Sequence, residues 1–312
     1  MFILNLILPF LLTYFITRIA LPYFKKYISA APTQRGLHNY SKPSGGGIIF
    51  SLICLIFSAN NNFFYLALIS MPLSIIGLID DRFNISSKYR LIVQLFTVIL
   101  IISYLKNNEI NFLNTFIDNN ILINFIFIFL GLAIINFINF MDGIDGLVSG
   151  SFIIVLLLTN SESNYLFPLI GSLIGFLFFN WQPSKIFMGD SGSLFLGSIF
   201  VGIIFKSNTN VQFLEILLLS TPLIIDPLIT LIRRVYNKQS FWEPHKLHLY
   251  QRLVSAGLSH STVSSIYIAS ILLLGIVYKF SNLINLIIFS GFVVILGLFL
   301  DYKFAINFNE RK

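Results

Sequence analysis

Residues 121–146 read ILINFIFIFLGLAIINFINFMDGIDG, a long apolar run that ends at the acidic residues Asp142 and Asp145. A run of about 20 apolar residues is long enough to cross the hydrocarbon core of a bilayer as a helix. Because its apolar residues are consecutive and do not alternate with polar ones, the run is not typical of a β-barrel strand. The stretch therefore predicts a membrane helix near residues 121–140 that ends in a polar motif.

Runs of the same kind recur along the whole chain of 312 residues, of which 56% are hydrophobic and only 11% are charged. Soluble globular proteins carry roughly 25% charged residues, so this composition excludes a soluble domain. We expect an all-α polytopic membrane protein with about eleven transmembrane helices in a single membrane domain, residues 1–312. The expected spans lie near residues 1–22, 45–59, 63–79, 91–105, 121–140, 147–159, 165–180, 194–206, 213–232, 262–279 and 282–300.

The basic residues indicate how the chain is oriented. Most of the 20 lysines and arginines fall in loops on one side if the N-terminus starts outside. Because basic loops usually face the cytoplasm, we expect an outer N-terminus and a cytoplasmic C-terminus. The net charge of +7 is then explained by topology and not by nucleic-acid binding. Acidic motifs that end the apolar runs fall on the same side, which predicts an active site on the cytoplasmic face.

One such motif is Asp80-Asp81-Arg82, at the end of the span expected near residues 63–79. Two carboxylates about 4 Å apart repel each other by roughly 4 kcal/mol at an effective dielectric constant of 20. A divalent cation or a basic substrate would relieve this repulsion. The alternative is a helix cap with a salt-bridging Arg82.

A second motif, Asn139-Phe-Met-Asp142-Gly-Ile-Asp145-Gly, ends the opening stretch. In a helix, Asp142 and Asp145 would lie on one face, and the two glycines would leave room for a phosphate or a metal. Because glycine weakens a helix by about 1 kcal/mol relative to alanine, two glycines here suggest a functional reason. A plain turn is the alternative interpretation.

A third motif covers residues 180–193 and reads NWQPSKIFMGDSGS. Pro183 ends one helix, and the Gly-Asp-Ser-Gly part begins the next, where backbone N–H groups can bind phosphate. Its candidate functional residues are Asn180, Lys185 and Asp190. A simple helix cap by Asp190 or Ser191 is the alternative.

Two loops with basic residues complete the set of candidates. The last loop carries His245, His248 and Arg252, which suit contacts to phosphate or sugar better than a zinc site, because further zinc ligands are sparse. The loop that precedes the second apolar run is expected to bind either substrate or lipid headgroups. Its candidates are Arg35, His38 and Lys42.

Taken together, these segments resemble the polyprenyl-phosphate N-acetylhexosamine-1-phosphate transferases over about residues 32–252. The matching pieces are Arg35-x-x-His38…Lys42-Pro-x-Gly-Gly, Asp80-Asp81-Arg82, Asn139-x-x-Asp142-Gly-x-Asp145-Gly146, Phe187-Met-Gly-Asp190-x-Gly-Ser193 and the His-rich last loop. Each piece alone is weak, whereas five in the family's order on one membrane side are specific. The last loop reads His248-Leu-Tyr250-Gln251-Arg252, where the best-known branches usually carry three close histidines. In this it looks more like the O-antigen initiating branch.

The resemblance implies that undecaprenyl phosphate attacks the sugar-side phosphorus of a UDP-N-acetyl sugar, giving undecaprenyl-diphospho-sugar and UMP. It also implies Mg²⁺, with Mn²⁺ as a substitute, on Asp190 and Asp145. Asp80 or Asp81 would orient the lipid phosphate, and Asp142 and Asp145 would line the metal and nucleotide site as the other catalytic acids. Substrate contacts would come from Lys42, Asn139, Asn180, Lys185, His245, His248 and Arg252.

The resemblance further implies a multi-pass protein of the bacterial inner membrane that initiates an O-antigen-like cell-envelope polysaccharide. The expected partners are undecaprenyl phosphate, a UDP-N-acetyl sugar and the lipid bilayer, with a homodimer left open and no nucleic acid. One alternative is a phospho-N-acetylmuramoyl-pentapeptide transferase of peptidoglycan synthesis. From a different class, a secondary transporter would place charges near the membrane midplane and show inverted repeats, whereas no repeat is evident here.

Overall fold

The computed structural model describes residues 2–30, 41–108, 121–160, 164–239 and 245–308. Within these residues, six helices are long and apolar enough to cross a membrane. They are α1 (Phe2–Tyr27), α3 (Phe64–Phe83), α4 (Ser87–Asn108), α6 (Ile121–Met141), α13 (His260–Phe280) and α14 (Leu283–Phe304). The all-α membrane class predicted from the apolar runs is therefore confirmed.

Shorter apolar helices fill the remaining predicted spans. They are α2 (Gly47–Phe57), α7 (Leu147–Thr159), α8 (Phe167–Asn180) and α9 (Gly189–Phe205). The span predicted as one helix near residues 213–232 consists of two, α10 (Asn210–Leu219) and α11 (Thr221–Tyr236), which meet at an angle of 76°. The break coincides with Pro222 in the first turn of α11, where a proline is compatible with a helix start but cannot continue the preceding helix.

By length and composition the described part of the chain holds six membrane-spanning helices, or seven if the bent pair counts as one. Each of the predicted spans overlaps at least one apolar helix, but the count of about eleven crossings depends on helices shorter than a bilayer requires and stays a prediction. Two elements were not expected: a two-residue antiparallel pair, β1 (Ser29–Ala30) with β2 (Lys42–Pro43), and the short helix α12 (Leu249–Ser255).

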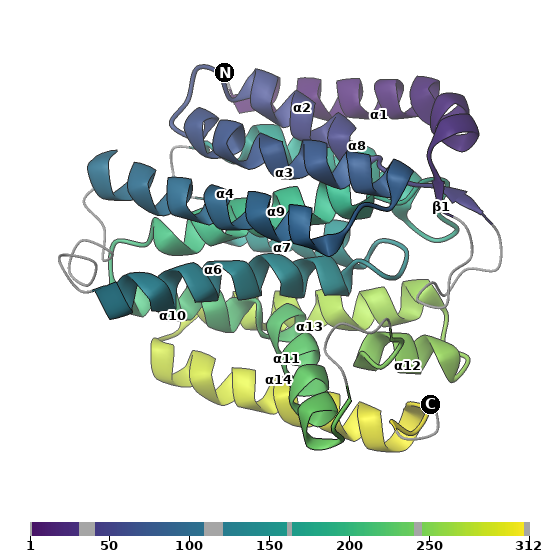
Figure 1. Ribbon diagram of the computed structural model, residues 1–312. Coiled ribbons are helices and arrows are strands. Elements are labelled where there is room, and N and C mark those ends of the chain that lie inside the picture. The colour runs from purple at the N-terminus through teal and green to yellow at the C-terminus, as the bar shows by residue number, and fades with distance from the viewer. Residues whose placement is uncertain (1, 31–40, 109–120, 161–163, 240–244, 309–312) are drawn as a thin grey trace.

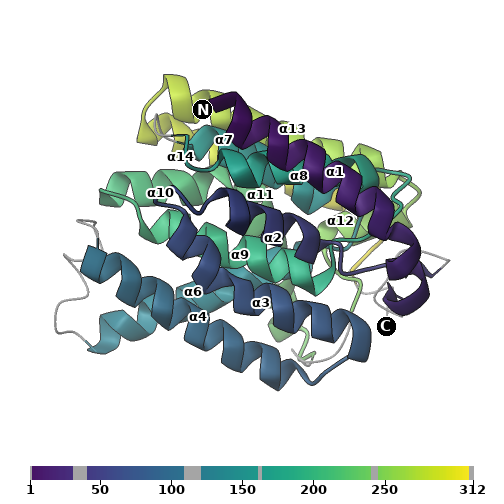
Figure 2. The same cartoon turned by 90° about the horizontal axis from the view of Figure 1, so that it is seen from above.

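Helix α9 forms the centre of the bundle, and its residues from Ser191 to Phe205 are all buried. Helices α2, α3 and α6 pack around it, while α1 lies along α8 at the edge (Figures 1 and 2). Glycines allow the closest approaches: a Cβ at Gly47 would lie 2.1 Å from the backbone N of Gly192, and one at Gly77 would lie 2.4 Å from the backbone of Asp190. Small residues bring membrane helices into backbone contact in this way, and here they bring α2 and α3 against the start of α9.

The outer helices present apolar side chains outward. Phe129 of α6, Ile19 of α1 and Ile284 of α14 are 74%, 77% and 67% exposed. Exposed apolar surface of this extent would be unfavourable in water, whereas in a bilayer it contacts lipid tails. The fold thus places its polar groups inside the bundle or at its ends.

Candidate active site

The sequence motifs meet at one end of the bundle, the end that holds β1 and α12 in Figure 1. Helices α3 and α6 finish at this end, and α4, α9 and α13 begin there. Residues that are far apart in the sequence consequently lie side by side. Arg90 of α4 pairs with Asp190 of α9, and Asp145 lies 3.3 Å from His260 of α13.

Arg90 bridges two of the predicted acidic residues. Its Nη1 lies 3.0 Å from Oδ2 of Asp80 and also pairs with Oδ2 of Asp190. Asn139 donates from Nδ2 to Oδ1 of Asp190 at 3.0 Å and to Oγ of Ser193 at 2.8 Å. Asp80, Arg90 and Asp190 are each between 16% and 23% exposed, so they remain accessible to a ligand. They form an ionic cluster, hereafter the Arg90 cluster, supplied by helices α3, α4 and α9.

Asp81 makes different contacts from those of its neighbour Asp80. Its carboxylate accepts the backbone N–H groups of Asp190 at 3.2 Å and Ser191 at 3.3 Å, and the hydroxyl of Ser44 at 3.0 Å. It therefore caps the N-terminus of α9 from another helix, where a negative charge also interacts favourably with the helix dipole. The cap predicted as an alternative at Asp190 is thus supplied by Asp81.

Gly189 makes this cap sterically feasible. Its φ is +67°, and a Cβ there would lie 2.3 Å from Oδ2 of Asp81. A left-handed conformation is costly for residues other than glycine. The Gly-Asp-Ser-Gly motif therefore has a structural explanation: the first glycine admits the capping carboxylate and directs Asp190 toward Arg90.

Asp142 and Asp145 lie in a turn between α6 and α7, so they are not on one face of a helix, and their predicted functional role stays a prediction. Asp145 is buried and accepts the backbone N–H of Ser184 at 3.1 Å and its hydroxyl at 2.8 Å. Burial alone would raise its pKa, but these bonds together with His260 and Lys42 lower the pKa to about 2.

Asp142 is only partly buried by its surroundings in the turn. Removal from water, with the nearby charges of Asp81 and Asp145, raises its pKa to about 8. A cation beside Asp142 would therefore stabilise the ionised form of its carboxyl group. A perturbed acid at a helix end is a typical feature of a functional site.

Lys42 connects the loop before α2 to the turn. Its Nζ donates to Oγ of Ser184 at 2.9 Å and lies 3.6 Å from Oδ2 of Asp145, and it also lies over the ring of Phe187. Its predicted phosphate contact stays a prediction, since the described contacts are to protein. Arg35 and His38 of the same loop lie outside the described residues.

Asn180 and Lys185 differ in their surroundings. Asn180 is buried: its Oδ1 accepts from Oγ of Ser149 at 2.7 Å, and its Nδ2 donates to the carbonyl of Ile186 at 3.1 Å. It joins α7, α8 and the following loop, which is a supporting role, and its predicted substrate contact stays a prediction. Lys185 is exposed, with its Nζ 5.9 Å from the ring centroid of Phe179.

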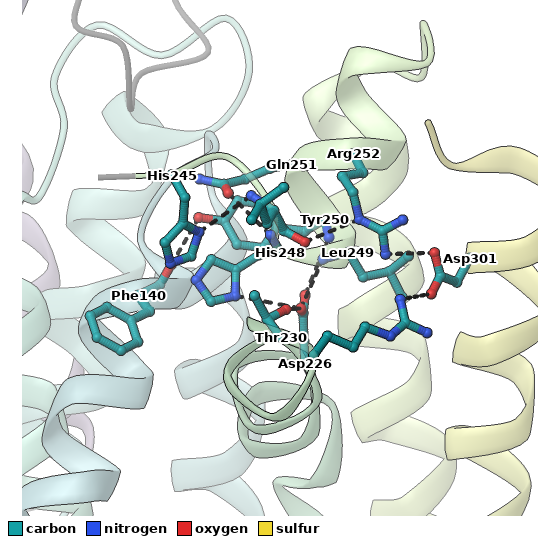
Figure 3. Close-up of polar contacts among 12 residues, drawn as sticks. Phe140, Asp226, Thr230, His245, His248, Leu249, Tyr250, Gln251, Arg252 and Asp301 are labelled. Atoms are coloured by element: carbon teal, nitrogen blue, oxygen red, sulfur yellow. Dashed lines mark hydrogen bonds and ion pairs between the residues drawn. The ribbon is translucent and has the colours of Figure 1, made fainter. Parts of the chain in front are cut away.

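The last loop is organised around Asp226 of α11 (Figure 3). Its carboxylate accepts the backbone N–H groups of Leu249 at 2.8 Å and Tyr250 at 3.2 Å, and the hydroxyl of Tyr267 at 2.6 Å. Asp226 thus caps α12, and His248 Nδ1 lies 3.6 Å from it. A second helix start in this protein is therefore held by an aspartate from another helix.

His245 and His248 lie together, with ring centroids 5.0 Å apart, and His248 stacks on Tyr250 at 5.8 Å. The Tyr250 hydroxyl donates to the carbonyl of Phe140 at 2.8 Å, and the Phe140 ring lies 5.9 Å from that of His248. Because Phe140 lies two residues before Asp142, this contact ties the last loop to the turn of the active site (Figure 3).

Arg252, predicted to contact sugar or diphosphate, has its guanidinium within the protein. Nε donates to the carbonyl of Leu247 at 3.0 Å, Nη1 to that of Ile306 at 3.0 Å, and Nη2 lies 2.5 Å from Oδ1 of Asp301. Its predicted substrate contact stays a prediction, and the geometry gives it the internal role of holding the loop.

The carboxylates of the Arg90 cluster, Asp80 and Asp190, suit a divalent cation. Among the described residues, no three His, Cys, Asp or Glu side chains converge as a complete metal cage. Mg²⁺ does not need one, because it is bound by one or two carboxylates together with waters and phosphate oxygens. Asp190 and Asp80 already share one cation, Arg90, whereas Asp145 is engaged with Lys42 and Ser184. The donors therefore fit a metal bound together with substrate. Asp80 is a further candidate ligand beside Asp190, because both contact Arg90, and the predicted metal contact of Asp145 stays a prediction.

Sequence reasoning missed Arg90, Ser184 and His260 as parts of the site. Arg90 looked like an ordinary basic residue of a loop, and Arg82 was the expected ion-pair partner; instead Arg82 is exposed with its guanidinium over the Phe83 ring. The signal available for Arg90 was its place in the first turn of α4, the helix that follows the one ending in Asp80 and Asp81. Nothing local distinguished the other two.

Comparison with known proteins agrees with the layout of these motifs. Residues 63–208, which include the Arg90 cluster and the turn, match the model of glycosyl transferase family 4. The chain is 31% identical over 307 residues to a probable undecaprenyl-phosphate N-acetylglucosaminyl 1-phosphate transferase of Bacillus subtilis, covering 91% of this chain and 83% of the relative. It is 30% identical over 254 residues to the undecaprenyl-phosphate alpha-N-acetylglucosaminyl 1-phosphate transferase of Thermotoga maritima, covering 78% and 80%.

A relative whose name gives another substrate matches over a shorter length. The phospho-N-acetylmuramoyl-pentapeptide-transferase of Halalkalibacterium halodurans is 30% identical over 238 residues, which cover 64% of this chain and 73% of the relative. With the polar ends of its membrane helices arranged as described, the chain belongs to glycosyl transferase family 4, the polyprenyl-phosphate hexosamine-1-phosphate transferases.

Proposed function

We propose that this protein transfers an N-acetylhexosamine 1-phosphate from a UDP-sugar to undecaprenyl phosphate. A phosphate oxygen of the lipid attacks the sugar-side phosphorus of the UDP-sugar, and the bond from that phosphorus to the bridging oxygen of UMP breaks. The products are undecaprenyl-diphospho-sugar and UMP. The names of the relatives from Bacillus subtilis and Thermotoga maritima support undecaprenyl phosphate as the acceptor and an N-acetylglucosaminyl 1-phosphate as the transferred group.

The observation that carries the proposal is the Arg90 cluster. Both substrates are anions, so a site that joins them must neutralise charge and hold the phosphates in line. Arg90 offers donors whose planar geometry matches phosphate oxygens. Asp190 and Asp80, supported by Asn139, offer carboxylates for Mg²⁺ or Mn²⁺, which would supply further neutralisation when bound.

The other acids have narrower parts in this proposal. Asp81 positions Asp190 by capping α9, and a general base is not required because a phosphate monoester is largely dianionic near pH 7. Asp142 lines the nucleotide side, where a cation would favour its ionised form. His245 and His248 would contact the sugar or diphosphate from the last loop.

Peptidoglycan synthesis is the second candidate, since phospho-N-acetylmuramoyl-pentapeptide transferases are also similar to this chain. It is less favoured because the last loop lacks the three close histidines that the best-known branches usually carry. Positions 250 and 251 hold tyrosine and glutamine instead, which contact Phe140 and the backbone of His248. We place the reaction on the cytoplasmic face of the bacterial inner membrane, from the distribution of basic residues. Its product would start an O-antigen-like polysaccharide.

The test is a transfer assay with protein in liposomes that contain undecaprenyl phosphate. Each of a panel of UDP-N-acetyl sugars, labelled in the sugar, is offered with Mg²⁺, and both labelled lipid and released UMP are measured. UDP-N-acetylmuramoyl-pentapeptide is included to separate the second candidate. Absence of turnover with every UDP-sugar would refute the proposal.

Asp190→Asn should reduce Mg²⁺-dependent release of UMP by about 100-fold or more, because it removes a charged ligand at the metal. Glu215→Gln in α10, which removes a carboxylate from the opposite end of the bundle, serves as the control. Full activity in the Asp190 variant would contradict the metal assignment.

A further inference from the structure

The C-terminal end of α14 contacts the last loop through Asp301. This residue, close to the end of α14, pairs through Oδ1 with Nη2 of Arg252 at 2.5 Å and through Oδ2 with Nη1 of Arg233. Its side chain is only 13% exposed and that of Arg252 only 3%. One carboxylate thus joins three helices, α11, α12 and α14 (Figure 3).

The residues after α14 add further contacts to the same arginines. The carbonyl of Ile306 accepts from Nη1 of Arg252 at 3.0 Å. The ring of Phe308, itself buried, has the guanidinium of Arg252 at 5.6 Å and that of Arg233 at 5.7 Å from its centroid. Cation–π contacts of this kind gain strength where the cation is desolvated. We call Asp301, Ile306 and Phe308 the C-terminal clamp.

The clamp reaches the active site through Arg252. Nε of Arg252 donates to the carbonyl of Leu247, and its backbone N–H donates to the carbonyl of His248. His248 in turn contacts Phe140, two residues before Asp142. Arg252 thus contacts the backbone on both sides of the peptide bond between Leu247 and His248, and it adds to the contacts that Asp226 and Tyr250 make with His248.

A plain stabilising role does not account for the placement of these charges. Burying an arginine costs free energy unless the charge is paired and its hydrogen bonds are satisfied. Replacing Arg252 and Asp301 by apolar residues would give packing without that cost. A guanidinium held at three points fixes direction as well as position, and that is what a loop needs if it must present histidines to a substrate.

We propose that Asp301 is a positioning residue that, with Ile306 and Phe308, holds Arg252 and thereby sets His245 and His248 for the UDP-sugar. The inference rests on the proposed function, because it assigns the loop to the sugar nucleotide. It makes the C-terminal end of the chain, outside the stretch of motifs, part of the specificity of the site.

The test compares Asp301→Asn, which removes the charge, with Asp301→Glu, which keeps it, in liposomes. Asp301→Asn should raise KM for the UDP-sugar by about tenfold, as expected for loss of a hydrogen bond to a charged group, with kcat and KM for undecaprenyl phosphate within about twofold. Asp301→Glu should recover most of the affinity. Lys303→Gln, on the same helix with its Nζ over the Phe299 and Phe304 rings, should behave as wild type.

A second readout does not depend on activity. Hydrogen exchange of residues 245–256 should speed up by about tenfold in Asp301→Asn and in Phe308→Ala, while helices α3 and α9 keep their protection. If hydrogen exchange is faster in the two variants but the wild-type protein shows no transfer activity, the clamp is supported and the proposed function is refuted. An unchanged KM together with unchanged exchange in both variants would overturn the clamp, and an equal rise in KM for both substrates would overturn its link to the sugar nucleotide.

Discussion

Arg90→Gln should make the enzyme bind Mg²⁺ more tightly while it works more slowly. Arg90 neutralises Asp80 and Asp190, the same carboxylates that suit the metal. At 3.0 Å and an effective dielectric constant of about 20, the Coulomb attraction between Arg90 and Asp80 is roughly 5–6 kcal/mol. Desolvation and side-chain ordering offset most of it, and a hydrogen bond to a charged group is worth about 1.5–3 kcal/mol net.

That net value corresponds to about 10–100-fold in an equilibrium constant. Without the competing cation, the apparent dissociation constant of Mg²⁺ should fall by a factor toward the lower end of this range. The rate of transfer should fall as well, because a phosphate loses its guanidinium partner. Both quantities come from Mg²⁺ titrations of UMP release at a fixed, saturating UDP-sugar concentration.

Arg82→Gln is the matched control, since Arg82 lies eight positions earlier, is exposed and stacks on Phe83. It removes the same charge from the same end of the bundle without touching the pair of acids. If both variants shift the Mg²⁺ constant equally, long-range charge explains the effect and the bridging role of Arg90 is wrong. A higher Mg²⁺ constant in Arg90→Gln alone would show that Arg90 supports the metal and does not compete with it.

Three further substitutions test the local geometry. Asp81→Ala removes the cap of α9 and should lower stability by about 1–2 kcal/mol, read as a lower Tm, with a larger loss of activity because Asp190 shifts; normal Tm and activity would contradict the capping role. Gly189→Ala forces a Cβ onto Asp81 at a left-handed backbone position and should reduce UMP release more than tenfold, whereas Gly291→Ala, where nothing lies within 4 Å, should be neutral. Tyr250→Phe removes the hydrogen bond to Phe140 and should cost about 0.5–1.5 kcal/mol, measured as a higher KM for the UDP-sugar; an unchanged KM would remove Tyr250 from the positioning of the loop.

The local sequence predicted the membrane helices and the acidic residues at their ends, because both follow from the kind of residue present. Long apolar runs produce membrane helices because unpaired backbone groups are too costly in lipid. Acidic residues therefore accumulate at the ends of those runs, and Asp80, Asp142 and Asp190 were identified as candidates on that ground. The break between α10 and α11 was not anticipated, because Pro222 is acceptable at a helix start and only packing decides whether a new helix begins there.

Roles within the site were less accessible to sequence reasoning. Asp80 and Asp81 are neighbours of identical chemistry, yet one faces Arg90 and the other caps α9. Successive residues in a helix point about 100° apart, so their partners depend on which helices pack on each side. The same reason applies to Arg252, because nothing in the sequence around it indicates that its guanidinium pairs with Asp301 of α14.

Hydropathy and motif order were thus enough to predict an all-α membrane protein with acidic helix ends, because both depend on residues close in sequence. Other features depend on helices that are far apart in the sequence. They are the close approach of α3 and α9 at Gly77 and Gly189, the bridge by Arg90, and the clamp from Asp301. Charge pairing and capping act over only a few ångströms. Which acid meets which base is therefore decided when the helices pack.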